Sequence, residues 1–272
     1  MNIIRTVSEM QECSRRARLA GKRIGVVPTM GYLHDGHLSL VDRAREAADF
    51  VVVTIFVNPT QFGPFEDLSK YPRDFERDCA LCAEHGVDVV FAPEPKDMYF
   101  PKHTTWVVEE SLTADLCGNS RPNHFRGVTT VVAKLFNAVL PDVAVFGQKD
   151  AQQALVIRRM VRDLNFPIEI LVAPLVREAD GLAMSSRNRY LSGDERRRAL
   201  SVSRTLLGLT RDKLNADTIW DSITRAGGRV DYVEIRDAET LGEVTAETRD
   251  ILVAVAAFFG ATRLIDNVIL SK

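Results

Sequence analysis

Pro28-Thr29-Met30-Gly31-Tyr32-Leu33-His34-Asp35-Gly36-His37 is the stretch that decides the fold of this 272-residue chain. It follows a short apolar segment at residues 24–27 that predicts a buried strand, and it precedes an amphipathic segment at residues 38–48 that predicts a helix. The two histidines therefore stand where a strand gives way to a helix N-terminus, which favours anions. Gly36 admits a phosphate close to the backbone, and the imidazoles add hydrogen-bond donors. The stretch predicts a site for the polyphosphate of a nucleotide.

Short apolar runs alternate with helical patterns over the first two thirds of the chain. The clearest run, residues 50–57, is β-branched and apolar on both faces, as in a strand of a parallel sheet. Further strands are predicted at residues 87–91, 105–108, 143–146 and 168–172, and helices at residues 7–20, 38–48, 74–85, 128–139 and 151–164. This alternation predicts a doubly wound, Rossmann-like α/β sheet with ligands at the carboxyl ends of its strands.

The pattern changes near residue 175. A polar loop at residues 177–188 leads to helices at residues 193–214 and 218–226 and to strands at residues 230–236, 251–258 and 263–269. We therefore interpret residues 1–175 as the Rossmann-like domain and residues 176–272 as a smaller α/β domain.

The composition excludes some classes of partner. With 35 Lys plus Arg against 37 Asp plus Glu, the chain lacks the charge excess of a protein that binds nucleic acid or membranes mainly by charge. The first residues lack the apolar core of a signal peptide, and we expect a cytoplasmic protein. Cys79 and Cys82 form a Cys-x-x-Cys within a predicted helix, without a second pair at zinc spacing, and predict an ordinary helical turn.

Two polar segments directly follow predicted strands. Residues 58–63, Asn-Pro-Thr-Gln-Phe-Gly, either bind a small polar ligand by two-way hydrogen bonding or form a plain turn. In residues 146–150, Phe-Gly-Gln-Lys-Asp, Lys149 is suited to a phosphate and Asp150 to ribose hydroxyls, although a solvated helix start has the same composition.

Two other segments carry cationic side chains. Residues 184–188, Met-Ser-Ser-Arg-Asn, offer two hydroxyls and an arginine that could neutralise a leaving pyrophosphate, or they form a surface loop. Residues 121–127, Arg-Pro-Asn-His-Phe-Arg-Gly, fit a substrate contact and a structural loop about equally well.

Several common nucleotide and nucleophile motifs are absent from the sequence. It contains no Walker-type phosphate loop, no Gly-x-Gly-x-x-Gly after the first strand and no Gly-x-Ser-x-Gly elbow. What remains is an ATP site of histidines, a lysine and a Ser/Arg loop. Such a set suits adenylyl transfer, which needs positioning and charge stabilisation rather than a covalent nucleophile.

Taken together, these segments resemble the pantoate–β-alanine ligase family. The matching pieces keep the family's order over nearly the whole chain: PTMGYLHDGH, FVNPTQFG, YPRDFERD, RPNHFRGV, FGQKDAQQ, VREADGLAMSSRNRYLS, DYVEIRD and TRLIDN. The His-x-Gly-His motif alone would match several nucleotidylyltransferases. The resemblance implies that ATP and pantoate give pantoyl adenylate and pyrophosphate, after which β-alanine displaces AMP to give pantothenate.

The resemblance also implies roles for individual residues. His34, His37, Lys149 and Arg187 would be catalytic, and Gln61 and Gln153 would bind pantoate, with Gln61 also near β-alanine. The smaller domain would close over the ATP site. The nucleotide would contact Met30, Gly31, Tyr32, Leu33, His34, Asp35, Gly36, His37, Gly147, Gln148, Lys149, Asp150, Val176, Met184, Ser185, Ser186 and Arg187.

Magnesium is expected to accompany ATP, held mostly by phosphates and water, with no direct protein ligand assigned even though Asp78 falls in the family region linked to the metal. The family implies a homodimer. Gln148 departs from the family, because many members have glutamate there; backbone contacts at that position would survive the change.

Two alternatives differ from this interpretation. A transferase that moves AMP or CMP onto a phosphorylated acceptor would share the histidines and the Ser/Arg loop, but it would not need the pair Gln61 and Gln153. A nucleotide sensor without turnover would tend to lose one of the four catalytic candidates, and all four are present.

Overall fold

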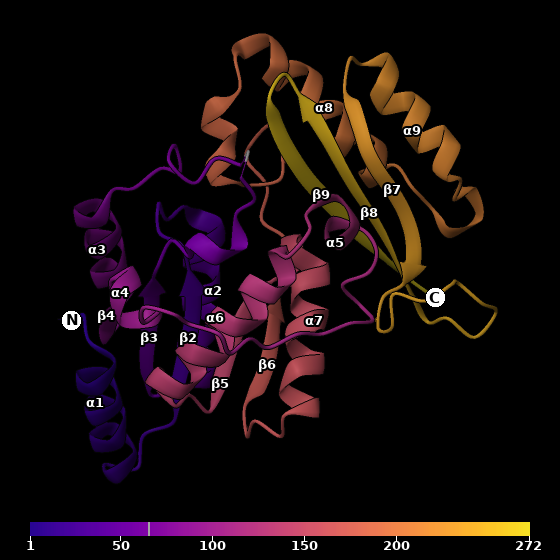
Figure 1. Ribbon diagram of the computed structural model, residues 1–272. Helices are drawn as coiled ribbons and strands as arrows, with labels where there is room; N and C mark the ends of the chain where they lie inside the picture. The colour runs from indigo at the N-terminus through magenta and orange to yellow at the C-terminus, as the bar shows by residue number, and fades with distance from the viewer. Residues whose placement is uncertain (65) are drawn as a thin grey trace. The chain divides into compact units, whose positions relative to one another are not determined.

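Six parallel strands form the sheet of the first of two units in the computed structural model, which describes residues 1–64 and 66–272 (Figure 1). The central strands carry apolar side chains that are buried on both faces, as Val51, Val52 and Val53 are in β3. The order is β1-β4-β3-β2-β5-β6, with bounds β1 Asn2–Ile4, β2 Ile24–Thr29, β3 Phe50–Ile55, β4 Val89–Phe91, β5 Val143–Gly147 and β6 Glu169–Ala173.

The strand order reverses between β2 and β5. The chain proceeds from β2 to β3 and β4 on one side, while β5 pairs with the other side of β2 through Gly25↔Val143 and Val26↔Ala144. Ligands of open α/β sheets bind at such a reversal, outside the carboxyl ends of the strands. The residues that follow Thr29 therefore lie at the expected ligand edge.

Helices cover both faces of this sheet. α1 packs against α6, whereas α2 packs against β2, β3 and β5, and the right-handed crossovers place α2 and α6 on opposite faces (Figure 1). Buried apolar residues surround most of α6, as expected for a helix enclosed in a core. The helices are α1 Val7–Leu19, α2 Asp35–Ala47, α3 Phe75–Glu84, α4 Pro95–Met98, α5 Cys117–Ser120, α6 His124–Val139 and α7 Ala151–Asp163.

The strand predicted at residues 105–108 is wrong. The backbone there bonds to side chains of α6 instead of to a strand, since the Val107 N–H donates to Thr130 Oγ1 (3.0 Å) and the Val107 carbonyl accepts from Thr129 Oγ1 (2.7 Å). Sequence analysis also missed β1, whose three residues are too few for a period-2 pattern to register.

The second unit comprises Gln148–Leu155 and Pro174–Lys272. Its three strands form an antiparallel sheet in the order β7-β8-β9, with β7 Arg229–Asp237, β8 Asp250–Phe259 and β9 Thr262–Ser271. Alternate residues of β8, among them Val253, Val255 and Phe259, share a core with α8 (Gly193–Leu207) and α9 (Ala216–Arg225).

The helix predicted at residues 193–214 ends earlier, at Leu207. Its start is fixed by a capping box, in which Ser192 Oγ accepts from the Glu195 N–H and the Glu195 carboxylate accepts from the Ser192 N–H. Gly208 caps its end, and a separate 3-10 turn follows at Arg211–Lys213.

Residues 148–155 belong by their contacts to the second unit, although sequence analysis placed everything up to residue 175 in the first domain. The reason is visible at Asn267 in β9, whose side-chain amide donates to the backbone carbonyls of Gln148 and Lys149. Across residues 1–64 and 66–272, the structure contains no helix with the length and apolar composition of a membrane span.

Candidate functional site

The turn between β2 and α2 is held in one conformation. Gly31 and Tyr32 both have left-handed backbones, with φ of 81° and 52°. Thr29 Oγ1 accepts from the Gly31 N–H (3.1 Å) and donates to the Thr54 carbonyl (2.6 Å), which ties the turn to β3. A Cβ at position 31 would lie 3.0 Å from Asp78 Oδ2 and Ile55 Cγ2, so close packing as well as the left-handed backbone favours glycine there.

Asp78 of α3 also stabilises this turn between β2 and α2. Its buried carboxylate accepts from the Tyr32 and Leu33 N–H groups, each at 2.7 Å. Burial is the dominant influence and raises the pKa of Asp78, while the two N–H groups and Arg77 favour its charged form. Asp78 is therefore a structural ligand of the backbone at Tyr32 and Leu33.

His34 and His37 lie together at the N-terminus of α2, as the strand–helix prediction required. His34 is the N-cap residue, and the two imidazole centroids are 4.0 Å apart. The His34 N–H donates to Nδ1 of His37 (3.4 Å), so a neutral His37 carries its proton on Nε2. Asp35 and Gly36 form the first turn of the helix between them. The arrangement can donate hydrogen bonds to an anion at a helix N-terminus.

The segment after β3 begins with the 3-10 turn η1 (Pro59–Gln61), capped by Asn58. Asn58 is buried, and its Oδ1 accepts from the Tyr99 hydroxyl (2.9 Å) and Thr60 Oγ1 (3.0 Å). Its Nδ2 therefore faces Gln61 and donates to Oε1 (3.1 Å). Nε2 of Gln61 donates to the Met30 sulfur (3.2 Å), which brings Gln61 to the predicted nucleotide turn within the first unit.

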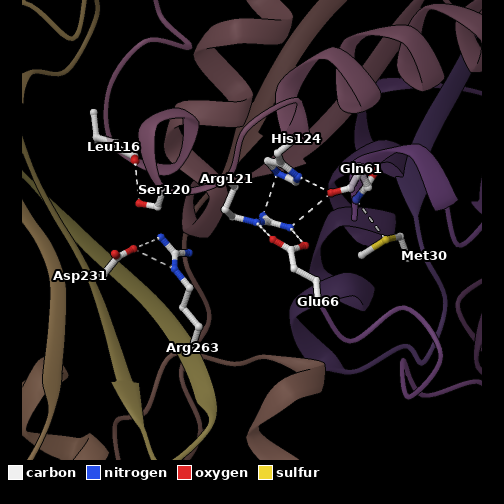
Figure 2. A network of polar contacts seen from close by, with 9 residues as sticks. All are labelled: Met30, Gln61, Glu66, Leu116, Ser120, Arg121, His124, Asp231 and Arg263. Carbon is white, nitrogen blue, oxygen red and sulfur yellow. Dashed lines mark hydrogen bonds and ion pairs between the residues drawn. The ribbon is translucent and has the colours of Figure 1, made fainter. Parts of the chain in front are cut away.

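Arg121 contacts this segment from the turn before α6, and His124 contacts it from the first position of α6 (Figure 2). Arg121 pairs with Glu66 through two hydrogen bonds of 2.7 Å and donates to His124 Nε2 (2.9 Å). His124 Nδ1 lies 2.8 Å from the Gln61 carbonyl oxygen. Burial opposes ionisation of Glu66, but Arg121 outweighs it and lowers the pKa of Glu66.

In the second unit, the predicted phosphate lysine lies in the 3-10 turn η2 (Gln148–Asp150). Lys149 Nζ is 3.2 Å from Asp150 Oδ2. Asn267 donates through Nδ2 to the carbonyls of Gln148 and Lys149, both at 3.0 Å, and accepts from Gln148 Nε2 at 3.2 Å. Gly147 ends β5 in the first unit, directly before this turn.

The Ser/Arg loop is held from within its own unit. The Met184 N–H donates to the Val176 carbonyl (3.0 Å), and Ser185 caps the 3-10 turn η3 (Ser186–Tyr190) by accepting from the Arg187 N–H (3.2 Å). At its base, Arg177 binds both carboxylate oxygens of buried Asp266, at 2.7 and 2.9 Å. Five predicted nucleotide contacts thus lie in one ordered loop: Val176, Met184, Ser185, Ser186 and Arg187.

The predicted site residues divide between the units. Met30–His37, Gln61 and Gly147 are in the first unit, and Gln148–Asp150, Gln153, Val176 and Met184–Arg187 are in the second. Gln153 is half-buried in the first turn of α7. The two predicted pantoate residues, Gln61 and Gln153, therefore belong to different units.

Sequence analysis missed Asn58, Glu66 and Asn267 as residues that position the site. Asn58 and Asn267 stood within quoted motifs, but no local signal distinguishes an amide that binds backbone from one that binds a ligand. Glu66 follows no recognisable pattern at all.

The Cys-x-x-Cys lies on α3, as predicted, with all four cysteines present as free thiols. Burial raises the pKa of Cys82 to about 12 and also raises the pKa of Cys79. Within the described part of the chain, no group of three or more His, Cys, Asp or Glu side chains could hold a metal ion.

Comparison with known proteins gives matches over nearly the whole chain. The family model described as pantoate-beta-alanine ligase matches residues 2–269. The pantothenate synthetase of Moorella thermoacetica is 54% identical over 99% of both chains, and that of Geobacter sulfurreducens is 52% identical over 100% of this chain and 99% of its own.

Solved structures match equally far along the chain. The pantothenate synthetase of Thermus thermophilus superposes with a TM-score of 0.90 at 47% identity, covering 98% of this chain and 99% of that one. The pantoate-beta-alanine ligase of Francisella tularensis, complexed with beta-gamma ATP and beta-alanine, gives a TM-score of 0.86 at 33% identity, with coverage of 98% and 97%.

Proposed function

The chain belongs to the pantoate–β-alanine ligase family and joins pantoate to β-alanine in an ATP-dependent reaction, and we propose that it does so through a pantoyl-adenylate intermediate. The observation that supports adenylation is the pair His34 and His37 at the N-terminus of α2, at the edge of the sheet where the strand order reverses. Donors and a helix dipole at that place suit a triphosphate.

In the first proposed step, a carboxylate oxygen of pantoate attacks the α-phosphorus of ATP. The bond from that phosphorus to the bridging oxygen breaks, and pyrophosphate leaves with the electron pair. Negative charge accumulates on phosphate oxygens in the transition state, so donors aimed at those oxygens lower the barrier. We assign this task to His34, His37, Lys149 and Arg187, with His37 donating through Nε2.

In the second proposed step, the neutral amine of β-alanine attacks the acyl carbon of the adenylate. AMP leaves with the electron pair of the cleaved carbon–oxygen bond, and the nitrogen loses a proton as the amide of pantothenate forms. This step also needs no covalent enzyme intermediate, so orientation of the two substrates is the main contribution of the protein.

Gln61 is our candidate for binding pantoate and for lying near β-alanine, and Gln153 for binding pantoate. Because Asn58 occupies Oε1 of Gln61, the Nε2 donor is the group turned toward Met30. A thioether sulfur is a weak acceptor, so an oxygen of pantoate would replace it favourably. Gln61 would thus recognise the acid substrate as a donor.

The remaining nucleotide contacts are proposed from the motif positions. Asp150 is assigned to the ribose and Lys149 to the phosphates. The other proposed contacts of the nucleotide are Met30, Gly31, Tyr32, Leu33, Asp35, Gly36, Gly147, Gln148, Val176, Met184, Ser185 and Ser186.

Magnesium is proposed as part of the ATP complex, carried by phosphate oxygens and water. The acidic side chains of the motifs fit that arrangement, because both oxygens of Asp78 accept from backbone N–H groups and Asp150 faces Lys149. When bound, the ion would neutralise phosphate charge. We also propose a homodimer on the family resemblance, which light scattering tests, and a cytoplasmic location as expected from the sequence.

The deciding experiment is ATP–pyrophosphate exchange with magnesium and pantoate but without β-alanine. We expect exchange that depends on pantoate, because the adenylate forms reversibly before β-alanine enters. If exchange is absent while pantothenate is still made, pantoate is not adenylated before β-alanine binds, and the proposed pantoyl-adenylate intermediate is wrong. If AMP is also absent after β-alanine is added, the assignment of the ligase reaction fails.

A further inference from the structure

The motif at residues 121–127 has no role in the proposed chemistry. Its Arg121 and His124 make no assigned substrate contact, yet both side chains are half-buried or buried and engaged with Glu66 and Gln61 (Figure 2). Glu66, Arg121 and His124 thus form one chain of hydrogen bonds that ends at the Gln61 carbonyl.

The direction of each hydrogen bond in this chain is fixed. Arginine only donates, so Nε2 of His124 must be the acceptor of the 2.9 Å bond from Arg121. The proton of the imidazole therefore sits on Nδ1, which donates to the Gln61 carbonyl oxygen 2.8 Å away. Glu66 holds the guanidinium by two bonds of 2.7 Å and prevents it from turning away.

The backbone of η1 and the first turn of α6 also approach closely. A Cβ at Gly127 would lie 2.5 Å from the Thr60 oxygen and 2.7 Å from the Gln61 nitrogen. Asn58 Nδ2 donates to the Gly127 carbonyl at 3.1 Å. The Gln61 backbone thus packs against α6 at Gly127 and is hydrogen-bonded to α6 through His124.

These contacts determine where the Gln61 side chain points. Asn58 fixes its Oε1, the bond from His124 fixes its carbonyl, and the Nε2 donor is left directed toward Met30. The Gln61 carbonyl also accepts a longer bond of 3.5 Å from Arg121 Nη2. Removal of the His124 donor would leave the carbonyl with this weaker bond and so loosen the backbone at Gln61, while the contacts of Asn58 with Tyr99 and Thr60 stay in place.

We propose that His124 is a positioning residue for the acid substrate: as the Nδ1–H tautomer selected by the Glu66–Arg121 pair, it holds the Gln61 backbone so that the Gln61 amide meets pantoate as a donor. This inference rests on the proposed role of Gln61. His124 itself acts through Gln61 and touches no substrate.

Two isosteric variants separate the two nitrogen atoms of the imidazole. His124→Asn keeps an N–H at the position of Nδ1, and His124→Gln keeps an acceptor at the position of Nε2 but loses the donor to Gln61. We expect the KM for pantoate to rise about tenfold in His124→Gln and no more than about threefold in His124→Asn, because one lost hydrogen bond changes an affinity by roughly that factor. The KM for ATP should stay unchanged in both.

The tautomer is measured separately, on the wild-type protein labelled with 15N-histidine. Long-range 1H–15N spectra distinguish Nδ1–H from Nε2–H, and loss of one of the five histidine signals in His124→Asn assigns the residue. A protonated Nε2, or a rapidly averaging tautomer, overturns the proposal whatever the activity and whether or not the variants fold.

The kinetic outcomes are equally distinct. If wild-type enzyme shows pantoate-dependent exchange and the two variants have equal KM values for pantoate, His124 does not position Gln61. If wild-type enzyme shows no pantoate-dependent exchange and makes no pantothenate, the proposed function fails, and the substrate named in this inference falls with it. A KM that rises for pantoate but not for ATP in His124→Gln, together with the Nδ1–H signal in the wild-type protein, supports the inference.

Discussion

Asn267 and Gln148 bind each other by two hydrogen bonds in opposite directions. Nδ2 of Asn267 donates to the Gln148 backbone carbonyl (3.0 Å), and Nε2 of Gln148 donates to Oδ1 of Asn267 (3.2 Å). Because Nδ2 also donates to the Lys149 carbonyl, two backbone oxygens fix the orientation of the Asn267 amide. Oδ1 must therefore face the side chain at position 148, which has to be a donor.

Gln148→Glu places a carboxylate against that oxygen. We expect the free energy of unfolding to fall by about 1 kcal/mol at neutral pH, because one hydrogen bond becomes a contact between two acceptors. The KM for ATP should change less than about threefold, because the two backbone bonds from Asn267 remain. Denaturant unfolding and steady-state kinetics measure both quantities.

Asn267→Ala is the matched control. It leaves two partly buried carbonyls without this donor, and we expect a loss of about 2 kcal/mol together with a raised KM for ATP. Equal effects of the two substitutions would contradict the account, since only the alanine variant releases the backbone of the Gln148–Asp150 turn.

His37→Ala and Lys149→Ala test the assigned phosphate contacts. Each should lower the rate of pantoate-dependent exchange by about 10²-fold or more while the circular dichroism spectrum stays native, because each removes a donor to developing negative charge. His85→Ala, which removes an imidazole bonded to Asp42 on α2, controls for loss of a histidine elsewhere. Wild-type turnover in either test variant rules out the phosphate assignment.

Cys82 should be almost inert in the folded protein. With a pKa of about 12, about one thiol in 10⁴ is ionised at pH 8, and the thiolate is the reactive form. We expect Cys82 to react with a disulfide reagent only on unfolding, as followed by mass spectrometry of the modified peptides. Fast modification of Cys82 in the native protein, or a Cys79–Cys82 disulfide, would contradict the helical assignment.

Gly127→Ala should loosen the junction between η1 and α6. The new Cβ meets backbone atoms at 2.5 and 2.7 Å, which cannot move aside as a flexible side chain can. We expect a loss of about 1–3 kcal/mol in unfolding free energy and a raised KM for pantoate, because Gln61 shifts with the turn. Gly193→Ala in α8 is the control, since its nearest neighbour is the flexible Arg197 guanidinium at 3.7 Å and stability should change little.

Local patterns were sufficient for strands β2 to β6, the crossovers between them and the histidine turn. β3 and the stretch around His34 and His37 carry their signals within about a dozen consecutive residues, as apolar runs and glycines. The strand wrongly predicted at residues 105–108 carries an equally good local pattern, but Thr129 and Thr130 of α6 take its backbone bonds instead.

The supporting residues escaped prediction for a different reason. Asp78 lies 45 residues from Leu33, and Asn267 lies 119 residues from Gln148. An acid in an amphipathic helix and an amide in a strand have many possible partners, and only tertiary packing selects a backbone N–H or carbonyl. The residues assigned to ligands thus stay predictions from local motifs, whereas the residues that hold them in place had no local signal.

Asp78 yields a prediction with a definite sign in pH. Burial raises its folded-state pKa above the usual 3.8, so the folded state binds the proton more tightly than the unfolded state does. Its contribution to stability is then full below the unfolded-state pKa and is lost as pH rises through the raised folded-state value. Asp78→Asn cannot titrate, so wild type should exceed the variant in unfolding free energy by more at acidic pH than at pH 7.

Unfolding by urea at a series of pH values measures that difference. At pH 7 we expect Asp78→Asn to be less stable by about 1–2 kcal/mol, because one of the Tyr32 and Leu33 N–H groups then faces an amide N–H₂ instead of an oxygen. The KM for ATP should also be higher in Asp78→Asn than in wild type, since these N–H groups fix the conformation of the turn that precedes His34. If the difference in unfolding free energy between wild type and Asp78→Asn becomes smaller as the pH falls, the two backbone donors outweigh burial and the pKa of Asp78 is lowered.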